Sequence, residues 1–385
     1  MEDRYTEQDI NFMRRAIELA KLGTGRVNPN PLVGAVIVKD GKIIGEGYHR
    51  RYGELHAERD ALAHLTEDAA GADMYVTLEP CCHYGKQPPC VDAIIEHGIK
   101  RVYCASDDPN ELVAGGGFKK LKDAGIEVIT HVLKEEADAI NDVFFHYIVN
   151  KTPYVVMKYA MTMDGKTATE IGDSKWVTGE SARAYVHELR NRLMGIMVGI
   201  GTVLEDDPML TCRMPGGRNP VRIICDSNLR LPLESRIVKT AGEVKTIVVS
   251  AISDTDGIGA SFYRRQKEEK GYQERKSALL EAGVDIIETE SINGFVNLSC
   301  LMKRLGDMHI DGILLEGGGN LNYSALKEGI VNELQVFVAS KIFGGYGRYN
   351  PVTGSGVKHP DDAYMFDLVD ITRYEDDICL RYKRF

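Results

Sequence analysis

The sequence predicts an α/β protein built from two domains, and three observations carry this prediction. The chain has 385 residues, well above the roughly 100–150 of a common single domain. In the first half, an apolar hairpin pattern precedes alternating helix and strand patterns, which favours a three-layer α/β/α domain. A second series of strand patterns begins after Thr152-Pro153, where a helix rarely continues because proline restricts the residue before it. We therefore expect one domain at 1–150 and another at 151–385.

The first domain opens on a helix-start signal. Thr6 and Asp9 have the spacing of a capping box, and apolar residues then recur at helical intervals. Asp40-Gly41 stands between two strand patterns and is a strong hairpin signal. The patterns predict, in order, helix 7–22, strands 32–39 and 42–48, helix 56–65, strand 73–78, helix 91–97, strand 101–105, helix 118–124, strand 126–129 and helix 134–149.

The second domain shows strand patterns spread along most of its length. They lie at 154–161, 196–200, 221–225, 246–250, 284–287, 313–315 and 334–339. The segment 261–275 is highly charged, which favours a solvated helix face or a surface insertion.

Composition narrows the classes of protein. Hydrophobic residues make up 43% of the chain and charged residues 27%, which is ordinary for a globular protein. The 47 basic and 57 acidic residues give a net charge of −10, which argues against nucleic-acid binding but leaves small anionic ligands open. Because no apolar run approaches the ~20 residues of a membrane span and no secretory signal is visible, we expect a cytoplasmic protein without a membrane partner. A homo-oligomer stays open.

The eight cysteines are unevenly distributed. Cys81, Cys82 and Cys90 lie within ten positions of one another, which points to a metal or a reactive thiol. The other five are expected to be inert fillers: Cys104, Cys212, Cys225, Cys300 and Cys379.

The strongest chemical signal combines two of these cysteines with a preceding His-x-Glu. His56, Cys81 and Cys90 supply the three protein ligands of a catalytic zinc site, which keeps its fourth position for water. Glu58 lies in the same helical turn as His56 and can act on that water without being a ligand. The alternative is a structural zinc site, closed by Cys82 or His83 as a fourth ligand.

This pattern is the signature of zinc-dependent nucleobase deaminases, although two residues usually separate the cysteines there and eight separate them here. The longer loop has the form PC-x-H-x-G-x-x-P-P-C. Together with a P-N-P-x-V-G turn at 29–34 and a D-P-N element at 108–110, it resembles the bifunctional deaminase–reductase family of riboflavin biosynthesis. Glu111 stands where that family often has a further proline.

The resemblance implies a cytidine-deaminase-like fold for the first domain and assigns its residues. Zinc would be held by His56, Cys81 and Cys90, with Glu58 as the catalytic residue. The substrate would be 2,5-diamino-6-(5-phosphoribosylamino)pyrimidin-4(3H)-one. Its pyrimidine and ribose phosphate would be held by Asn30, His49, His83 and Lys86.

The second domain lacks a Rossmann fingerprint, since no third glycine follows Gly199-Ile200-Gly201. Glu316 is followed by Gly317-Gly318-Gly319, a turn that can present backbone N–H groups to an anion but is often only a turn. With the stretches 158–168, 174–176 and 201–208, this turn resembles the reductase domain of the same family, a relative of the dihydrofolate reductase fold.

The resemblance implies NADPH-dependent reduction of the ribosyl group of 5-amino-6-(5-phosphoribosylamino)uracil to the ribityl product. Lys158 and Glu316 would assist proton delivery. The NADPH site would be lined by Ala160, Trp176, Thr202, Asp206, Ser227, Gly318, Gly319, Asn320, Leu321, Asn322, Tyr323 and Ser324. The substrate would contact Ser174, Arg190, Leu210, Arg213 and Glu316. Without the resemblance, Trp176 reads as a core or interface filler, Asp206 as part of a surface turn and Lys158 as a solvated strand lysine.

Two other classes of protein stay open at this point. One is a nucleic-acid editing deaminase with an accessory domain, which the acidic composition disfavours. The other is a binding or regulatory protein that keeps the fold without turnover. The intact His56, Glu58, Cys81 and Cys90 argue against this for the first domain, whereas a reductase domain that has lost its activity stays open.

Overall fold

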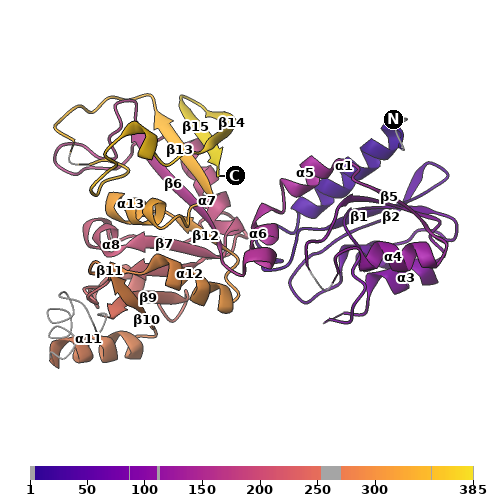
Figure 1. The fold of residues 1–385 in the computed structure, drawn as a ribbon, viewed down its shortest axis with the longest axis horizontal. Coiled ribbons are helices and arrows are strands. Elements are labelled where there is room, and N and C mark those ends of the chain that lie inside the picture. The colour runs from indigo at the N-terminus through magenta and orange to yellow at the C-terminus, as the bar shows by residue number, and fades with distance from the viewer. Residues whose placement is uncertain (1–4, 86, 111–112, 253–269, 348, 385) are drawn as a thin grey trace. The chain divides into compact units, whose positions relative to one another are not determined.

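The computed structural model describes residues 5–85, 87–110, 113–252, 270–347 and 349–384. The chain divides into two compact units, Met1–Lys151 and Thr152–Phe385, each with its own sheet and helices (Figure 1).

The sheet of the first unit has the strand order β2-β1-β3-β4-β5. Strand β1 is antiparallel to β2 and β3, whereas β3, β4 and β5 are parallel. The predicted hairpin turn is confirmed, because Asp40 and Gly41 have φ values of 50° and 76°, as a two-residue hairpin requires. The strands are β1 (Gly34–Lys39), β2 (Lys42–Tyr48), β3 (Asp73–Leu78), β4 (Arg101–Ser106) and β5 (Glu127–Thr130).

Helices cover both faces of this sheet, which confirms the three-layer prediction (Figure 1). Helices α2, α3 and α4 bury Ala61, Ile94 and Leu121 against one face, and α1 and α5 bury Met13 and Ala137 against the other. The helices are α1 (Glu7–Lys21), α2 (Ala57–Ala63), α3 (Cys90–Glu96), α4 (Gly116–Asp123), α5 (Lys134–Asp138) and α6 (Asp142–Asn150). The capping box of Thr6 and Asp9 is present at the start of α1.

The single helix predicted at 134–149 is wrong, because the structure has two helices there, α5 and α6. The chain leaves the helix at 139–141, and Asn141 pairs with a distant backbone instead. Its Oδ1 accepts the Leu32 N–H at 2.8 Å, and its Nδ2 donates to the Leu32 carbonyl at 2.9 Å. This tertiary pairing has no counterpart in the local sequence pattern.

The second unit contains a ten-stranded sheet of order β11-β10-β9-β8-β7-β12-β6-β13-β15-β14. Neighbouring strands are parallel along the run β10-β9-β8-β7-β12-β6-β13. The outer strands β11, β15 and β14 pair antiparallel with their neighbours. The strands are β6 (Tyr154–Thr162), β7 (Gly195–Gly199), β8 (Val221–Cys225), β9 (Thr246–Ile252), β10 (Asp285–Ile292), β11 (Phe295–Val296), β12 (Gly312–Leu315), β13 (Glu333–Ala339), β14 (Asp367–Tyr374) and β15 (Asp377–Lys383).

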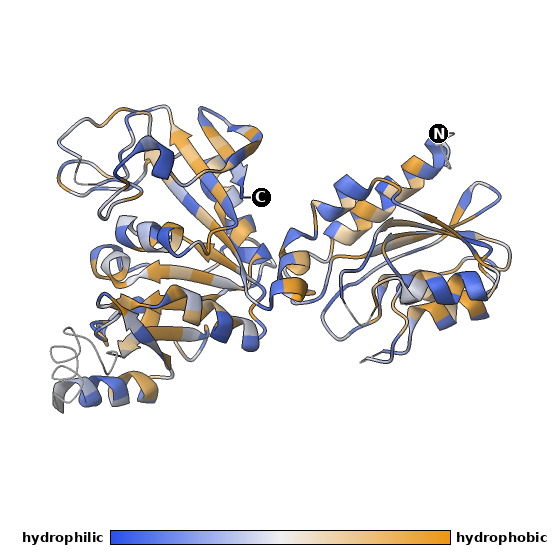
Figure 2. Ribbon diagram, in the orientation of Figure 1, coloured by the Kyte–Doolittle hydropathy of each residue, from blue (hydrophilic) through white to orange (hydrophobic). Residues whose placement is uncertain are grey.

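Helices again lie on both faces of the sheet. Helices α12 and α13 share one apolar core with the strands, and α8, α9 and α11 share another. Figure 2 shows apolar residues concentrated in the strands and on the helix faces that meet them. The helices are α7 (Glu180–Arg192), α8 (Ile200–Asp206), α9 (Arg236–Lys239), α11 (Lys270–Glu281), α12 (Leu298–Asp307), α13 (Gly319–Lys327) and the short 3₁₀ helix η1 (Pro360–Asp362).

All seven predicted strands of this unit are present, but sequence analysis missed β11, β14 and β15. Strand β14 is an edge strand that is exposed along most of its length, so it lacks the half-buried alternation on which the prediction relies. Of the charged segment, 261–269 lies outside the described residues and 270–275 begins α11.

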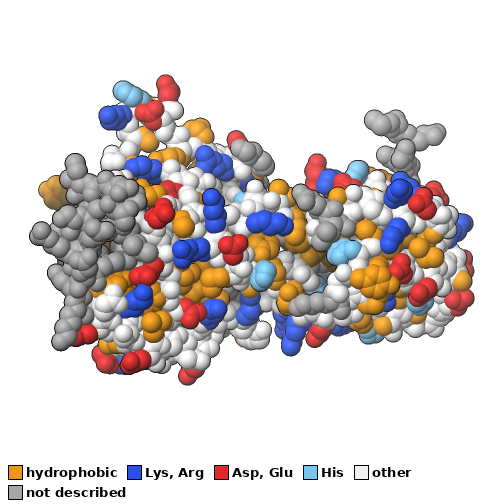
Figure 3. Space-filling view, turned by 60° about the horizontal axis from the view of Figure 1, so that its bottom comes forward, with side chains coloured by type: hydrophobic (Ala, Val, Ile, Leu, Met, Phe, Trp, Pro, Cys, Tyr) orange, Lys and Arg blue, Asp and Glu red, His pale blue; other side chains and the backbone are white. Residues whose placement is uncertain are grey.

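Within the described ranges, no helix combines the length and hydropathy that a membrane span needs. On the face drawn in Figure 3, the described basic and acidic side chains are interspersed rather than gathered in one basic stripe.

Candidate active sites

The three predicted zinc ligands meet at one edge of the first unit. His56 caps the N-terminus of α2, Cys81 follows β3, and Cys90 is the first residue of α3. The Nδ1 atom of His56 lies 3.5 Å from the Cys81 Sγ and 3.4 Å from the Cys90 Sγ. All three ligand atoms lie within 4.8 Å of one another. One imidazole nitrogen and two sulfurs at this spacing fit a zinc ion.

The cluster is not closed by a fourth protein ligand. Of the described side chains, neither Cys82 nor His83 joins it. The Cys82 Sγ lies against α4 instead, 2.9 Å from where a Cβ on Gly116 would stand. Three ligands are the number expected of a catalytic zinc site, so the structural-zinc alternative finds no support in these residues.

The two thiols differ in their surroundings. A hydrogen bond from Cys90 lowers the pKa of the Cys81 thiol to about 4, and the Cys90 backbone N–H also donates to the Cys81 Sγ at 3.3 Å. The sequence predicts Cys90 just before a helix, whereas the structure makes it the first helical residue, with Pro89 as the N-cap. The thiolate, which the lowered pKa favours at Cys81, is the form of cysteine that binds a metal.

Glu58 is the second residue of α2, and its side chain is buried next to the cluster. Glu58 is 3% exposed. Burial raises the pKa of its carboxyl to about 7. It is close enough to the ligands for the charges of Cys81 and His56 to act on it, yet it is not one of the ligands.

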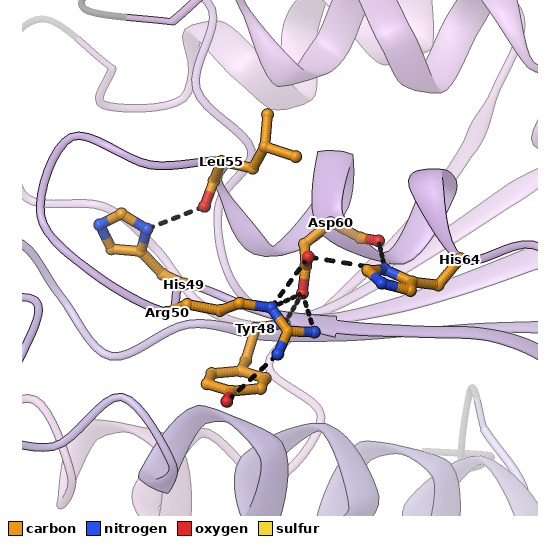
Figure 4. A network of polar contacts seen from close by, with 6 residues as sticks. All are labelled: Tyr48, His49, Arg50, Leu55, Asp60 and His64. Atoms are coloured by element: carbon orange, nitrogen blue, oxygen red, sulfur yellow. Dashed lines mark hydrogen bonds and ion pairs between the residues drawn. The ribbon is translucent and has the colours of Figure 1, made fainter.

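His49 and Asn30 form a second pair beside the cluster. The Nδ1 of His49 donates to the Leu55 carbonyl at 2.9 Å (Figure 4). Its Nε2 is therefore the acceptor for the Asn30 carboxamide at 3.2 Å. Burial lowers the pKa of His49, and its ring centroid lies 5.6 Å from that of His56. The lowered pKa favours the neutral form of the His49 imidazole, which lies buried beside the cluster.

The two remaining predicted substrate residues lie on the cysteine loop. The Nδ1 of His83 is buried and has no hydrogen-bond partner among the described residues. Lys86 lies outside the described residues.

Sequence analysis missed the network that holds α2 in place, which is centred on Asp60 (Figure 4). This carboxylate is 3% exposed and accepts the Tyr48 N–H at 3.0 Å. The Arg50 Nε lies 3.1 Å from both of its oxygens. Asp60 therefore ties the helix that carries His56 and Glu58 to the segment that carries His49. An acidic residue on the buried side of a predicted helix was the available signal.

The second unit contains an open cleft of about 1570 Å³. It lies where the parallel strands β6, β12, β7 and β8 end, the edge at which open α/β sheets bind ligands. Sites for one small ligand usually measure about 300–1,000 Å³, so this cleft has room for a cofactor and a substrate together.

Nearly all the residues predicted for the second site line this cleft. They are Lys158, Ala160, Ser174, Trp176, Arg190, Thr202, Asp206, Leu210, Arg213, Ser227, Glu316, Gly318, Gly319, Asn320, Leu321, Tyr323 and Ser324. Asn322 is the exception. It is fully buried, and its Nδ2 donates to the Pro351 carbonyl at 2.8 Å, because its place on α13 turns it away from the cleft.

Lys158, Glu316 and Arg190 form a partly buried ionic cluster in the cleft. The parallel register pairs Met157 of β6 with Leu315 of β12, so the next residues, Lys158 and Glu316, are neighbours. The Lys158 Nζ lies 3.7 Å from the Glu316 Oε1, and the Arg190 Nη2 lies 2.6 Å from the Glu316 Oε2. Lys158 is therefore not a solvated strand lysine.

The charges of this cluster influence one another. Burial raises the pKa of Glu316, but the cations of Arg190 and Lys158 outweigh that effect and hold the pKa below its usual value. Burial lowers the pKa of Lys158, although Glu316 opposes the shift. A cation of this kind gives up a proton more readily than a solvated lysine does.

The glycine turn that precedes α13 is closely packed. A Cβ on Gly319 would lie 2.7 Å from the Thr353 Cγ2 and 2.9 Å from the Asn350 carbonyl, so a larger residue does not fit there. The turn therefore brings the N-terminus of α13 into the cleft with bare backbone, which suits an anionic ligand.

Trp176 lies at the rim of the cleft and is 58% exposed. The Arg183 guanidinium stacks on its ring, with the Cζ 4.5 Å from the ring centroid. This exposure is inconsistent with the interpretation of Trp176 as a residue that fills the hydrophobic core. Sequence analysis missed Arg183, and the other polar cleft residues that it missed include His187, Asn228, Arg230 and Arg236. Polar residues directly after a predicted strand were the signal for Asn228 and Arg230.

The fold and the two sites define a zinc deaminase domain followed by a reductase domain, and comparisons with known proteins agree. Residues 6–106 match the family described as the cytidine and deoxycytidylate deaminase zinc-binding region, and residues 153–380 match the RibD C-terminal domain. The riboflavin biosynthesis protein RibD of Actinobacillus pleuropneumoniae is 50% identical over 98% of this chain and 96% of its own length. That of Escherichia coli K12 is 38% identical over 97% and 98%.

Solved structures show the same relationship over both units. The deaminase/reductase of Thermotoga maritima matches with a TM-score of 0.82 and 37% identity, covering 98% of both chains. The RibD of Acinetobacter baumannii matches with a TM-score of 0.83 and 35% identity, covering 98% of this chain and 99% of the other. The chain belongs to the RibD family of riboflavin biosynthesis proteins. It is a bifunctional enzyme that uses zinc for deamination and NADPH for reduction.

Proposed function

We propose that residues 1–150 deaminate 2,5-diamino-6-(5-phosphoribosylamino)pyrimidin-4(3H)-one and that residues 151–385 reduce the 5-amino-6-(5-phosphoribosylamino)uracil that results. The name of the Thermotoga maritima protein combines the same two activities. The observation that carries the proposal is the presence of two different sites in one chain. One unit holds a His-Cys-Cys cluster of three metal-ligating side chains with a buried glutamate beside it, and the other holds a cleft with room for a cofactor and a substrate.

In the deamination, His56, Cys81 and Cys90 would hold the zinc ion. When bound, zinc supplies Lewis-acid chemistry that makes water a nucleophile near neutral pH. The Glu58 carboxylate takes a proton from the attacking water and returns it to the departing amino nitrogen, so that ammonia leaves. Its burial beside the ligands, without being one of them, suits this task.

Asn30, His49, His83 and Lys86 bind the substrate in this proposal. His49 acts through its neutral ring. It holds the Asn30 carboxamide in one orientation by accepting its N–H, and both residues therefore suit the pyrimidine better than the phosphate. The cation needed for the phosphate is assigned to Lys86.

In the reduction, the cofactor residues named above bind NADPH in the cleft, with the exception of Asn322, which faces away from it. When bound, NADPH supplies a hydride to C1′ of the opened ribose. Lys158 donates the proton that the ribose ring oxygen needs on opening, and Glu316 holds Lys158 beside Arg190. Arg190 and Arg213 bind the substrate phosphate, Ser174 also contacts the substrate, and Leu210 provides an apolar wall.

The test follows the two products separately. The zinc-loaded enzyme is incubated with the diaminopyrimidine substrate, with and without NADPH, while ammonia release and NADPH oxidation are recorded. We expect ammonia in both samples and NADPH oxidation that depends on prior deamination. The Lys158→Met variant should release ammonia at the normal rate and fail to oxidise NADPH. Ammonia release without any NADPH oxidation by the unmodified enzyme would contradict the proposed reduction.

A further inference from the structure

The loop 226–231, which follows β8, presents polar side chains to the reductase cleft. Along this loop, Asp226, Leu229 and Leu231 are buried, at 0%, 0% and 3% exposure. The intervening Ser227, Asn228 and Arg230 line the cleft instead. The loop thus offers a hydroxyl, a carboxamide and a guanidinium to whatever binds there, and Arg236 of α9 lines the same cleft.

Backbone and side-chain hydrogen bonds fix this loop. The Asp226 N–H donates to the Val249 carbonyl at 2.9 Å, and the Leu231 N–H donates to the Asp226 Oδ2 at 2.8 Å. The Ala251 N–H donates to the Ser227 carbonyl at 3.2 Å, which ties the loop to the end of β9. The polar side chains are therefore carried on a rigid support.

Arg230 forms an ion pair with a neighbouring residue, yet its side chain remains accessible. Its Nε lies 3.6 Å from the Asp226 Oδ1, a buried oxygen that has no hydrogen-bond partner among the described residues. The Arg230 side chain is nevertheless 54% exposed. Asp226 thus holds the guanidinium through its Nε, and Arg230 remains exposed and lines the cleft.

The position of the loop along the cleft indicates which part of the cofactor it meets. The ionic cluster of Lys158 and Glu316 lies between β6 and β12, and the strand order then continues to β7 and β8. No described residue of β13 lines the cleft, so a cofactor with its nicotinamide at that cluster extends toward β8. Two strand spacings, about 10 Å, separate the ends of β12 and β8, with the glycine turn before α13 and Thr202 along the way.

We infer that Arg230, with Ser227 and Asn228, binds the 2′-phosphate of NADPH and is the residue that makes the reductase prefer NADPH to NADH. This inference rests on the proposed placement of NADPH in the cleft. A guanidinium matches a phosphate with several donors at once, whereas the 2′-hydroxyl of NADH offers it no charge. The dianionic 2′-phosphate is the one group that distinguishes the two cofactors, and Arg230 is the cation of this loop.

The test measures binding of two fragments that differ by this phosphate alone. Adenosine 2′,5′-bisphosphate carries it and 5′-AMP lacks it. Calorimetric titration of the full-length protein should show tighter binding of the bisphosphate by the unmodified chain. The Arg230→Gln variant should lose about 10- to 100-fold in affinity for the bisphosphate, with little change for 5′-AMP. Arg230→Lys should retain part of the preference.

Matched controls separate the possible failures. Arg304 is an exposed arginine on α12 that does not line the cleft, so Arg304→Gln should bind both fragments normally. Trp176 is the only tryptophan of the chain and lies in the cleft, so its fluorescence reports NADPH and NADH binding independently of turnover. NADPH should bind Arg230→Gln as weakly as NADH does.

Three results would overturn the inference. If Arg230→Gln weakens both fragments equally, the residue serves the adenosine or the loop rather than the 2′-phosphate. If it weakens neither while the unmodified chain still prefers the bisphosphate, another group selects NADPH. If neither NADPH nor either fragment binds the unmodified chain, the placement of the cofactor in this cleft fails along with the inference.

Discussion

At the scale of single residues, the deaminase site depends on a carboxyl that is buried beside the metal ligands but does not join them. Glu58 follows His56 by two positions, which places both in the first turn of α2. A carboxyl on this turn reaches the same region as the His56 ring, while Cys81 and Cys90 complete the ligand set from other elements. In the proposed mechanism, metal binding and proton transfer therefore fall to different side chains.

Replacing Glu58 with Gln tests that separation. The amide keeps the shape of the side chain but cannot carry the proton between water and the leaving nitrogen. We expect ammonia release to fall by about 10²–10⁴-fold, with zinc content near one per chain and NADPH-dependent reduction of added 5-amino-6-(5-phosphoribosylamino)uracil unchanged. Metal analysis and the two separate rate assays check this. Normal ammonia release by Glu58→Gln would remove the residue from the reaction.

These residues could be predicted from the sequence because each follows an element boundary that local patterns reveal. His56 begins a helix, Cys81 follows a strand, and Cys90 begins the next helix. The pairing of Asp60 with Arg50 could not be predicted in the same way. It joins a helix to a segment beyond a strand, and which residues meet there depends on how closely the two pack.

At the scale of elements, the close approach of α2 to β2 positions the catalytic turn. Gly47 on β2 faces this helix, and a Cβ there would lie 2.2 Å from the Ala61 N and 2.6 Å from the Ala57 carbonyl. A Cβ on Gly45 would lie 2.7 Å from the Ala61 carbonyl. The two glycines thus let the helix backbone lie directly on the strand, which sets the height of His56 and Glu58 above the sheet.

The Gly47→Ala substitution should therefore disturb the deaminase site indirectly, by displacing α2, because residue 47 is not itself part of the site. The added methyl meets helix backbone that cannot rotate away, so we expect a loss of about 1–3 kcal/mol in stability and a lower deamination rate. Chemical denaturation and the ammonia assay measure the two effects. Gly242→Ala is the matched control, because a Cβ there meets nothing within 4 Å. If Gly47→Ala behaves like Gly242→Ala, the close approach does not position α2.

The elements that sequence analysis missed share one physical cause. The break between α5 and α6 depends on Asn141 pairing with Leu32, more than a hundred positions away. Strand β14 is held by its pairing with β15 at the sheet edge rather than by a buried face. In both cases a tertiary contact decides the structure, whereas local hydrophobic periodicity predicts the other helices and strands.

At the scale of the whole molecule, the two activities rest on separate folding units. The apolar cores of the first unit contain residues of α1 to α5 and its own sheet, and those of the second contain residues of its own helices and strands. The proposed zinc ligands all belong to the first unit, and the cleft belongs to the second. A ligand of one unit should accordingly stabilise that unit alone.

Removing zinc tests this independence. A metal present at a thousandfold above its dissociation constant stabilises the folded state by about 4 kcal/mol, so chelation should lower the melting temperature of the first unit by on the order of 10 °C. Scanning calorimetry should then show one transition that moves with zinc and a second that moves with NADP⁺. The chelated enzyme should release no ammonia yet still reduce added 5-amino-6-(5-phosphoribosylamino)uracil, and zinc should restore the deamination. Cys300→Ser, outside the cluster, should respond to the chelator as the unmodified chain does. A single transition that moves with both ligands would show instead that the two units unfold as one.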